Sequence, residues 1–217
     1  HSNVISYIEW AVEAFEITSE DKILGTAPFN FDMSTFDIYV TLKAGAGLYV
    51  APEGYLLFPA QLMGFVEKHE LTLWKGISSL LMYLARAGAL DAERIPTLKR
   101  ILFGGENLPT KHLMNWMQTY PDKRFYNVYG PTEATGISTC YPVLEIPTHH
   151  DEAIPIGTPC TDSEVIIVDQ NNACVEVGDV GELCIKGGGL SRGYWRDEQK
   201  TSCSFVVNPS TNVPGDI

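Results

Sequence analysis

Residues 127–135, with the sequence NVYGPTEAT, carry the strongest structural signal in the chain. Residues 124–126 before it form an apolar and aromatic run typical of a buried strand, and the Gly-Pro pair inside the stretch ends that strand. Thr132 and Glu133 then place a hydroxyl and a carboxylate at a turn beside the ring of Tyr129. A phosphate needs hydroxyl donors, its cation needs hard oxygen ligands, and a purine needs a flat apolar face. The stretch therefore predicts either a nucleotide site or a plain turn with a solvated glutamate.

The same stretch resembles the most specific motif of the adenylate-forming superfamily, in particular of the amino-acid adenylation domains of nonribosomal peptide synthetases. Three further stretches match that family in the same order: FNFDMS at 29–34, FGGENL at 103–108 and GELCIKGGGLSRGYW at 181–195. The likeness covers essentially all 217 residues. It implies a layered α/β fold with a largely parallel sheet flanked by helices, followed by a small β-rich, barrel-like subdomain.

Composition and charge exclude several classes of function. Apolar residues make up 45% of the chain, which is enough for a full core, and the net charge of −12 argues against a nucleic-acid surface. No apolar run approaches the length of a membrane span. The five cysteines are scattered without a C-x-x-C pair and predict reduced thiols, hence a cytoplasmic protein. The polar cluster at 149–152 (His-His-Asp-Glu) predicts a solvated loop rather than a metal site.

Hydrophobic periodicity predicts alternating helices and strands, followed by short β runs. The expected helices cover residues 2–17, 34–43, 60–70, 79–89 and 110–120, and the expected strands cover residues 22–27, 48–50, 71–75, 99–103 and 124–126. Four prolines in 141–161 predict a boundary, so we expect an α/β subdomain at 1–142 and a β-rich subdomain at 143–217. The β runs expected in the second part are 164–169, 182–186 and 205–207.

The resemblance implies roles for the residues around the first stretch. Thr132 would hydrogen-bond the α-phosphate of ATP and Glu133 would hold Mg²⁺, so both are expected at the catalytic centre. Two glycines at 104–105 allow close approach of the backbone to a flat ligand, although a tight turn before the helix at 110–120 explains them equally. The expected nucleotide-binding residues are Gly104, Gly105, Glu106, Asn127, Tyr129, Gly130 and Thr132.

The resemblance also implies an amino-acid pocket. Asp32 would pair with the substrate's α-ammonium group, because a buried carboxylate needs an opposite charge; the alternative is that Asp32 or Ser34 caps a helix. If Lys75 faces the substrate, a substrate with an acidic side chain is favoured. If Gly76 faces it, the pocket is roomy. A third possibility is that Lys75 extends from the end of its strand without contacting a substrate. The expected substrate-binding residues are Asp32, Met33, Phe36, Lys75, Gly76, Leu102, Gly104, Val128, Gly136 and Ile137, with Met33 and Phe36 equally explained as core.

The implied reaction is ATP-dependent activation of an amino-acid carboxylate as aminoacyl-AMP, for loading onto the phosphopantetheine thiol of a peptidyl carrier protein. ATP and Mg²⁺ are the implied cofactors, and an amino acid and a carrier protein the implied partners. The alternatives are a carboxylate–CoA or aryl-acid ligase of the same superfamily, or a non-catalytic module that keeps the fold.

Several parts of the family pattern are not found in these 217 residues. They are a glycine-rich loop upstream, an aspartate for the ribose downstream and a C-terminal subdomain with a lysine. Asp216 lacks the sequence context of the ribose aspartate. We therefore expect the sequence to be a fragment that is inactive alone.

Overall fold

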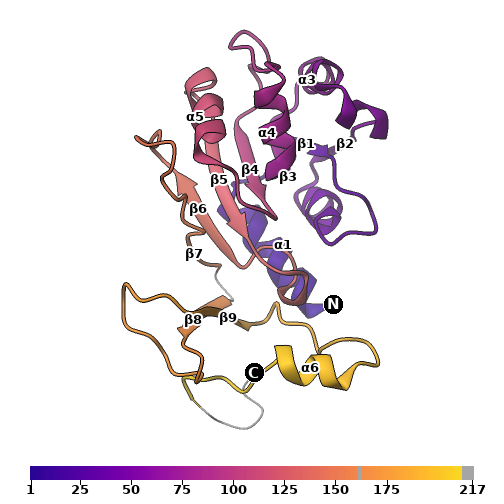
Figure 1. The fold of residues 1–217 in the computed structure, drawn as a ribbon. Coiled ribbons are helices and arrows are strands. Elements are labelled where there is room, and N and C mark those ends of the chain that lie inside the picture. Colours follow the sequence, from indigo (N-terminus) through magenta and orange to yellow (C-terminus); the bar gives the residue numbers. More distant parts are fainter. Residues whose placement is uncertain (161–162, 212–217) are drawn as a thin grey trace.

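The computed structural model describes residues 1–160 and 163–211, which form an α/β body and a smaller lobe below it in Figure 1. The body contains a seven-stranded sheet with the order β2-β1-β3-β4-β5-β6-β7. The four pairings from β2 to β5 are parallel, and β6 and β7 are added antiparallel. The strands are β1 (Lys22–Gly25), β2 (Gly47–Val50), β3 (Leu73–Ile77), β4 (Arg100–Gly104), β5 (Arg124–Tyr129), β6 (Thr139–Val143) and β7 (Thr158–Pro159). The largely parallel sheet is confirmed.

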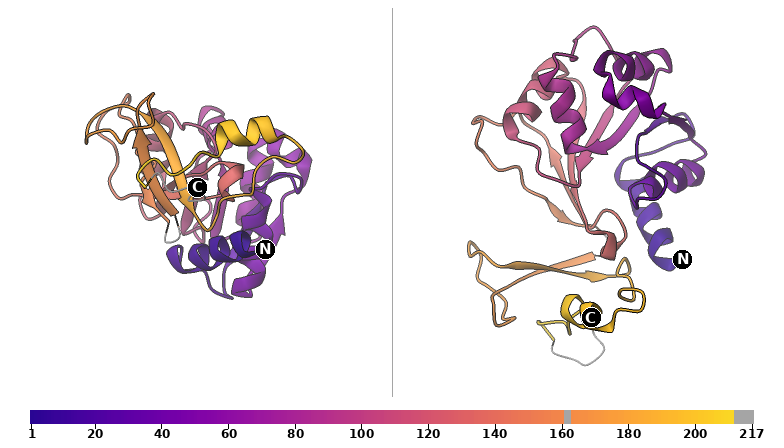
Figure 2. Two further views of the ribbon diagram at one scale, coloured as in Figure 1. Left: turned by 90° about the horizontal axis from the view of Figure 1, so that it is seen from below. Right: turned by 45° about the vertical axis from the view of Figure 1, so that its right-hand side comes forward.

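Helices cover both faces of this sheet, as Figure 2 shows in two further views. One face carries α3, α4 and α5, and the other carries α1 and the segment from η1 to α2. These helices are α1 (Ser2–Ala14), η1, a π-helix (Phe36–Val40), α2 (Thr41–Ala44), α3 (Pro59–Lys68), α4 (Ser78–Arg86) and α5 (Thr110–Thr119), with short 3₁₀ turns η2 (Glu53–Leu57) and η3 (Thr132–Ala134). Each predicted helix of the body is present within a few residues of its expected bounds.

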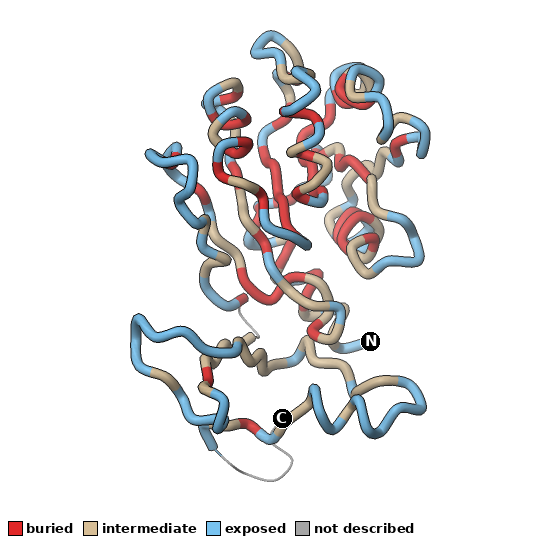
Figure 3. The backbone as a smooth tube through the Cα atoms, viewed as in Figure 1, coloured by how far each residue is buried: buried red, intermediate tan, exposed pale blue. Residues whose placement is uncertain are grey.

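Two apolar clusters fill the spaces between the sheet and its helices, and strand alternation assigns residues to them. Along β4, Ile101 and Phe103 belong to the cluster under α3–α5, whereas Leu102 between them belongs to the cluster under α1. Successive side chains of a strand point to opposite faces, so this alternation fixes which residues of each strand share a face. Figure 3 shows that the buried residues concentrate in this body and are sparse in the smaller lobe.

The predicted helix at 34–43 begins later and without the expected cap. The Ser34 hydroxyl donates to the carbonyl of Phe31 at 2.8 Å, and the Asp32 side chain accepts no bond from a helix N–H among the described residues. The first helical turn is a π-helix from Phe36, a form often found at functional sites. Both capping alternatives are therefore wrong, and the Asp32 carboxylate is left available.

The smaller lobe differs from the prediction in two ways. Its strands β8 (Ser163–Val168) and β9 (Glu182–Gly187) form an antiparallel pair, and the described part of the lobe shows no closed barrel. The strand predicted at 205–207 is wrong. The Phe205 N–H bonds to the carbonyl of Thr201 at 2.8 Å, so this residue ends helix α6 (Glu198–Ser204) instead of joining a sheet. The boundary at residue 142 stays a prediction, although β7 still pairs with the large sheet.

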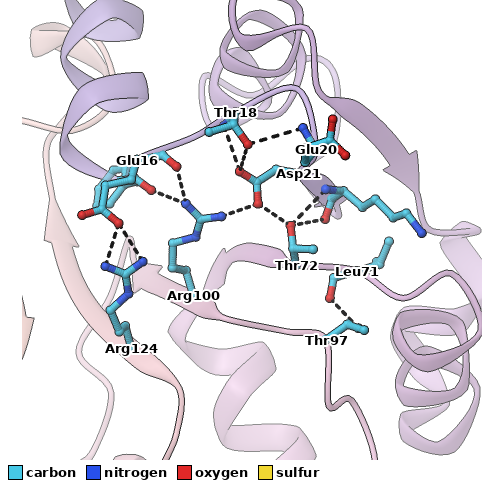
Figure 4. Close-up of polar contacts among 11 residues, drawn as sticks. Glu16, Thr18, Glu20, Asp21, Leu71, Thr72, Thr97, Arg100 and Arg124 are labelled. Carbon is cyan, nitrogen blue, oxygen red and sulfur yellow. Dashed lines mark hydrogen bonds and ion pairs between the residues drawn. The ribbon is translucent and has the colours of Figure 1, made fainter.

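A buried ionic network lies where the parallel strands begin (Figure 4). The Arg100 guanidinium, 3% exposed, pairs with the Asp21 carboxylate and donates to the carbonyl of Glu16 at 2.9 Å. Asp21 also accepts a bond from the Thr72 hydroxyl at 2.6 Å. These bonds connect the starts of β1, β3 and β4 at the edge opposite the candidate site, and the Nε atom of Arg100 is buried without a hydrogen-bond partner.

The remaining sequence expectations concern the surface and the thiols. No helix in the described ranges is long and apolar enough to cross a membrane. The five cysteines are free. The His-His-Asp-Glu segment at 149–152 is exposed, as predicted, and no metal-holding group of three His, Cys, Asp or Glu side chains occurs among the described residues.

Candidate active site

The turn after β5 folds back on itself so tightly that it requires glycine. A Cβ atom on Gly130 would lie 2.1 Å from the carbonyl oxygen of Gly136, and the Ser138 N–H closes the turn by donating to the carbonyl of Tyr129 at 2.8 Å. Within it, Thr135 and Gly136 both adopt positive φ values. The resulting loop presents Thr132 to solvent at the carboxyl end of β5, where open α/β sheets bind ligands.

This loop forms one wall of a cavity of about 230 Å³. The other walls come from the segment after β1, from β3 and from the turn after β4, which lie far apart in the sequence. The lining residues are Phe31, Asp32, Met33, Lys75, Gly104, Gly105, Val128, Tyr129, Gly130, Pro131, Thr132, Gly136 and Ile137. All but two of them, Phe31 and Pro131, are residues that the sequence predicted for the nucleotide or the amino acid.

Six predicted site residues lie outside this lining. Phe36 and Leu102 are fully buried in the cluster behind the cavity. The Asn127 side-chain amide donates to the carbonyl of Pro155 at 2.8 Å, and Glu106 is exposed and accepts a bond from the Ser79 N–H at 3.3 Å. The remaining two are Gly76 and Glu133. The structure thus brings most of the predicted set together around one space.

Strand alternation distinguishes Lys75 from Gly76. Trp74 packs in the cluster under α3–α5, and a Cβ atom on Gly76 would meet the Trp74 indole nitrogen at 2.7 Å, so Gly76 faces the same side. Leu73 packs in the cluster under α1, and Lys75 points to that side and lines the cavity. Of the two residues, Lys75 is therefore the one that faces the cavity.

Lys75 carries a buried charge. Its ammonium group donates to the carbonyl of Met33 at 3.0 Å and lies 5.2 Å from the centroid of the Phe36 ring, and it makes no ion pair among the described residues. Burial lowers the pKa of Lys75 to about 8, against the opposing attraction of Asp37 and Asp32. An ammonium group has three donors, so Lys75 has hydrogen-bonding capacity left for a ligand.

Two buried side chains beside the cavity were missed by sequence reasoning. Asp37 is 1% exposed, its Oδ1 atom has no hydrogen-bond partner, and burial raises its pKa to about 6 although Lys75 and the backbone N–H groups of residues 26–27 oppose the shift. The Tyr7 hydroxyl of α1 is also buried without a partner, and burial, followed by Asp37 and Asp32, raises its pKa well above the ordinary value. A carboxylate five residues after Asp32 on a short helical segment was the available signal for Asp37.

Glu133 lies on the other side of the turn, at a cavity of about 450 Å³ between the body and the smaller lobe. Its carboxylate accepts a hydrogen bond from the Tyr194 hydroxyl, which lowers the pKa of Glu133 below its ordinary value. A single carboxylate fits Mg²⁺, which is commonly bound by one or two carboxylates together with substrate phosphates. Tyr129 and Pro131 line both cavities, and Glu133 follows Pro131 by two residues.

Residues 1–195 match the model of a protein family described as AMP-binding enzyme. The chain belongs to the AMP-binding enzyme family. The match covers all four stretches quoted from the sequence, so the recognition of the adenylate-forming superfamily is confirmed.

Relatives of this AMP-binding enzyme chain include ligases that act with carrier proteins. It is 33% identical over 195 residues to an L-proline–[L-prolyl-carrier protein] ligase of Pseudomonas fluorescens, covering 90% of this chain and 39% of that protein. It is 31% identical to a D-alanine–D-alanyl carrier protein ligase of Lactiplantibacillus plantarum, covering 94% of this chain and 41% of the relative. The chain therefore spans about two fifths of these relatives.

Solved structures agree with this assignment. The crystal structure of CmiS6 superposes with a TM-score of 0.90 at 29% identity, over 100% of this chain and 52% of that one. The nonribosomal peptide synthetase FmoA3 superposes with a TM-score of 0.89 at 25% identity, over 98% of this chain and 23% of that one. The fold of this AMP-binding enzyme chain is that of synthetase adenylation domains.

Proposed function

We propose that the full-length protein activates an amino acid as its aminoacyl-AMP and passes the aminoacyl group to a carrier-protein thiol. In the first step a carboxylate oxygen of the amino acid attacks the α-phosphorus of ATP. The bond from that phosphorus to the bridging oxygen breaks, and pyrophosphate leaves with the electron pair. In the second step the thiol attacks the mixed anhydride, which gives a thioester and AMP.

The observation that carries the proposal is the cavity that Asp32, Lys75, Tyr129 and Thr132 line together. Thr132 offers a hydroxyl donor to the α-phosphate, and Tyr129 with the glycine turn at 104–105 offers flat walls to the adenine. Asp32 has a carboxylate without a partner among the described residues, which suits the α-ammonium group of an amino acid. The attacking group belongs to the substrate, so these residues act by positioning it.

Glu133 would hold Mg²⁺ on the ATP phosphates. When bound, the ion neutralises phosphate charge and so favours attack on phosphorus. The Thr132 hydroxyl would donate a hydrogen bond to the α-phosphate and so stabilise the charge that develops there.

We infer that the side chain of the amino acid ends in a carboxylate. Lys75 is 4% exposed, lines the cavity and has no ion-pair partner among the described residues. Burial lowers the pKa of Lys75, and the charges of the Asp37 and Asp32 carboxylates oppose that shift, but neither carboxylate forms an ion pair with it. A substrate carboxylate would supply the missing partner, and a buried ammonium group without one is costly.

ATP–pyrophosphate exchange by the full-length protein tests the proposal. We expect exchange with aspartate or glutamate, weaker exchange with asparagine or glutamine, and loss of exchange in Asp32→Ala. Exchange with fatty or aryl acids alone would overturn the amino-acid assignment in favour of a CoA or aryl-acid ligase. Exchange with an apolar amino acid alone would overturn the role given to Lys75. Absence of exchange, together with no binding of ATP, would favour a non-catalytic module.

A further inference from the structure

A loop of the smaller lobe, residues 188–195, lies against the turn that carries Thr132 and Glu133. The Ser191 N–H donates to the carbonyl of Glu133 at 2.7 Å, and the Thr135 hydroxyl donates to the carbonyl of Gly189 at 2.7 Å. Gly189 lies so close that a Cβ atom there would be 2.6 Å from the carbonyl oxygen of Ala134. These contacts, which the loop makes with its own backbone groups, hold the loop on the turn without the Tyr194 side chain.

The loop also contacts the turn through a hydrogen bond between two side chains. The Tyr194 hydroxyl donates to Oε1 of Glu133, across 61 residues of sequence. A carboxylate has two oxygens and about four acceptor sites, so one bond from a hydroxyl leaves Oε2 free. The bond fixes the rotation of a side chain that is otherwise flexible.

The tyrosine ring is itself held on several sides. The Lys200 ammonium lies 4.0 Å from the ring centroid, and the Phe205 ring packs edge-on with centroids 5.9 Å apart. The Tyr194 N–H donates to the Thr201 hydroxyl at 2.9 Å. Gly193 has φ +118°, and a Cβ atom there would meet a Thr201 methyl group at 2.4 Å, so this approach requires glycine. The hydroxyl therefore has a defined position.

We propose that Tyr194 is a positioning residue whose hydroxyl holds one oxygen of the Glu133 carboxylate, leaving the second oxygen available to the magnesium ion of bound ATP. The inference rests on the proposed function, because it takes Glu133 as the magnesium ligand. The loop stays in place through its backbone bonds without this hydroxyl. Its contribution is therefore to the orientation of the carboxylate and not to the attachment of the lobe.

The test is the variant Tyr194→Phe in the full-length protein, measured by calorimetric binding of a non-hydrolysable ATP analogue with and without Mg²⁺. We expect the gain in affinity that Mg²⁺ gives to fall about five- to tenfold, as for loss of one typical intramolecular hydrogen bond, with unchanged affinity in EDTA. The Mg²⁺ concentration for half-maximal pyrophosphate exchange should rise by the same factor, with the KM for the amino acid unchanged.

Tyr83→Phe is the matched control, because it removes an exposed hydroxyl that donates to the carbonyl of Leu57 at 2.9 Å. It should keep the wild-type dependence on Mg²⁺. Two results would overturn the inference and make the contact structural. One is that Tyr194→Phe loses equal affinity with and without Mg²⁺. The other is that Tyr194→Phe has a lowered melting temperature but an unchanged Mg²⁺ effect.

Glu133→Gln separates this inference from the proposed function. If Glu133→Gln abolishes the Mg²⁺-dependent gain and Tyr194→Phe leaves it intact, the metal assignment stands and the positioning role of Tyr194 is wrong. If Glu133→Gln retains the whole gain, Glu133 is not the metal ligand and both statements are wrong.

Discussion

Replacing Lys75 with methionine should make the protein more stable while it removes activity on acidic amino acids. The pKa of Lys75 falls from 10.5 to about 8 on burial, and such a difference corresponds to about 3 kcal/mol of cost to the folded state at neutral pH. Methionine fills a similar volume without the charge. The pKa of about 8 already includes the attraction to Asp37, so only loss of the bond to the carbonyl of Met33 remains to be subtracted, and it offsets about 1–2 kcal/mol of this gain. We expect Lys75→Met to raise the free energy of unfolding by about 1–2 kcal/mol.

Urea unfolding of the full-length protein followed by tryptophan fluorescence measures this change, since Trp74 is fully buried beside Lys75. The matched control is Lys43→Met, where the side chain is exposed and pairs with Glu9 at the surface; such surface changes usually stay within about 0.5 kcal/mol. A loss of about 2 kcal/mol or more in Lys75→Met would refute the reasoning, because Lys75 would then be a structural tether rather than a buried charge held for a ligand.

The sign of the pH dependence follows from the same pKa. Because the folded pKa of Lys75 lies below its unfolded value, the folded chain binds fewer protons between about pH 8 and 10.5. The contribution of Lys75 to stability therefore rises with pH across that window. Lys75→Met should lack this rise, so the stability difference between variant and wild type should shrink above pH 8.

Three other predictions concern the buried ionic network, the glycine turn after β4 and the activity of residues 1–217 alone. Asp21→Ala leaves the buried Arg100 without its partner and should cost about 3–5 kcal/mol in urea unfolding, with a nucleotide Kd unchanged under native conditions; a cost below 1 kcal/mol would contradict the network's role. Gly104→Ala places a Cβ atom 2.1 Å from the carbonyl oxygen of Val128, so pyrophosphate exchange should fall at least tenfold, and normal exchange would contradict the close approach. Residues 1–217 purified alone should show no exchange, and measurable exchange would disprove that prediction.

The body of the fold could be predicted because its signals are local. The Gly-Pro pair at 130–131 ends β5 as expected, and the apolar periodicity of 60–70 and 110–120 gives α3 and α5. Local pattern failed at 205–207, where the sequence predicts a strand but Phe205 ends helix α6. The Phe205 ring packs against the Tyr194 ring and not within a sheet, and no local sequence pattern reveals that contact.

The candidate site was predictable in its members but not in its arrangement. The motif identified Asp32, Thr132 and Glu133, but it did not distinguish Lys75 from Gly76, because the register of one strand relative to its neighbours decides which faces the cavity. Asp37 was missed because its importance comes from burial beside Lys75 and not from its neighbours in sequence. Side chains that only the tertiary fold brings together give no local signal in the sequence.

In the proposed function, one cavity joins an amino acid to AMP. Trapping the acyl-adenylate with hydroxylamine, and identifying the hydroxamate by mass spectrometry, tests it most directly in the full-length protein supplied with ATP, Mg²⁺ and a mixture of amino, fatty and aryl acids. We expect the hydroxamate of an amino acid with an acidic side chain, and we expect Asp32→Ala to form none. A hydroxamate formed only from an acid without an amino group, or formed equally by Asp32→Ala, would contradict it.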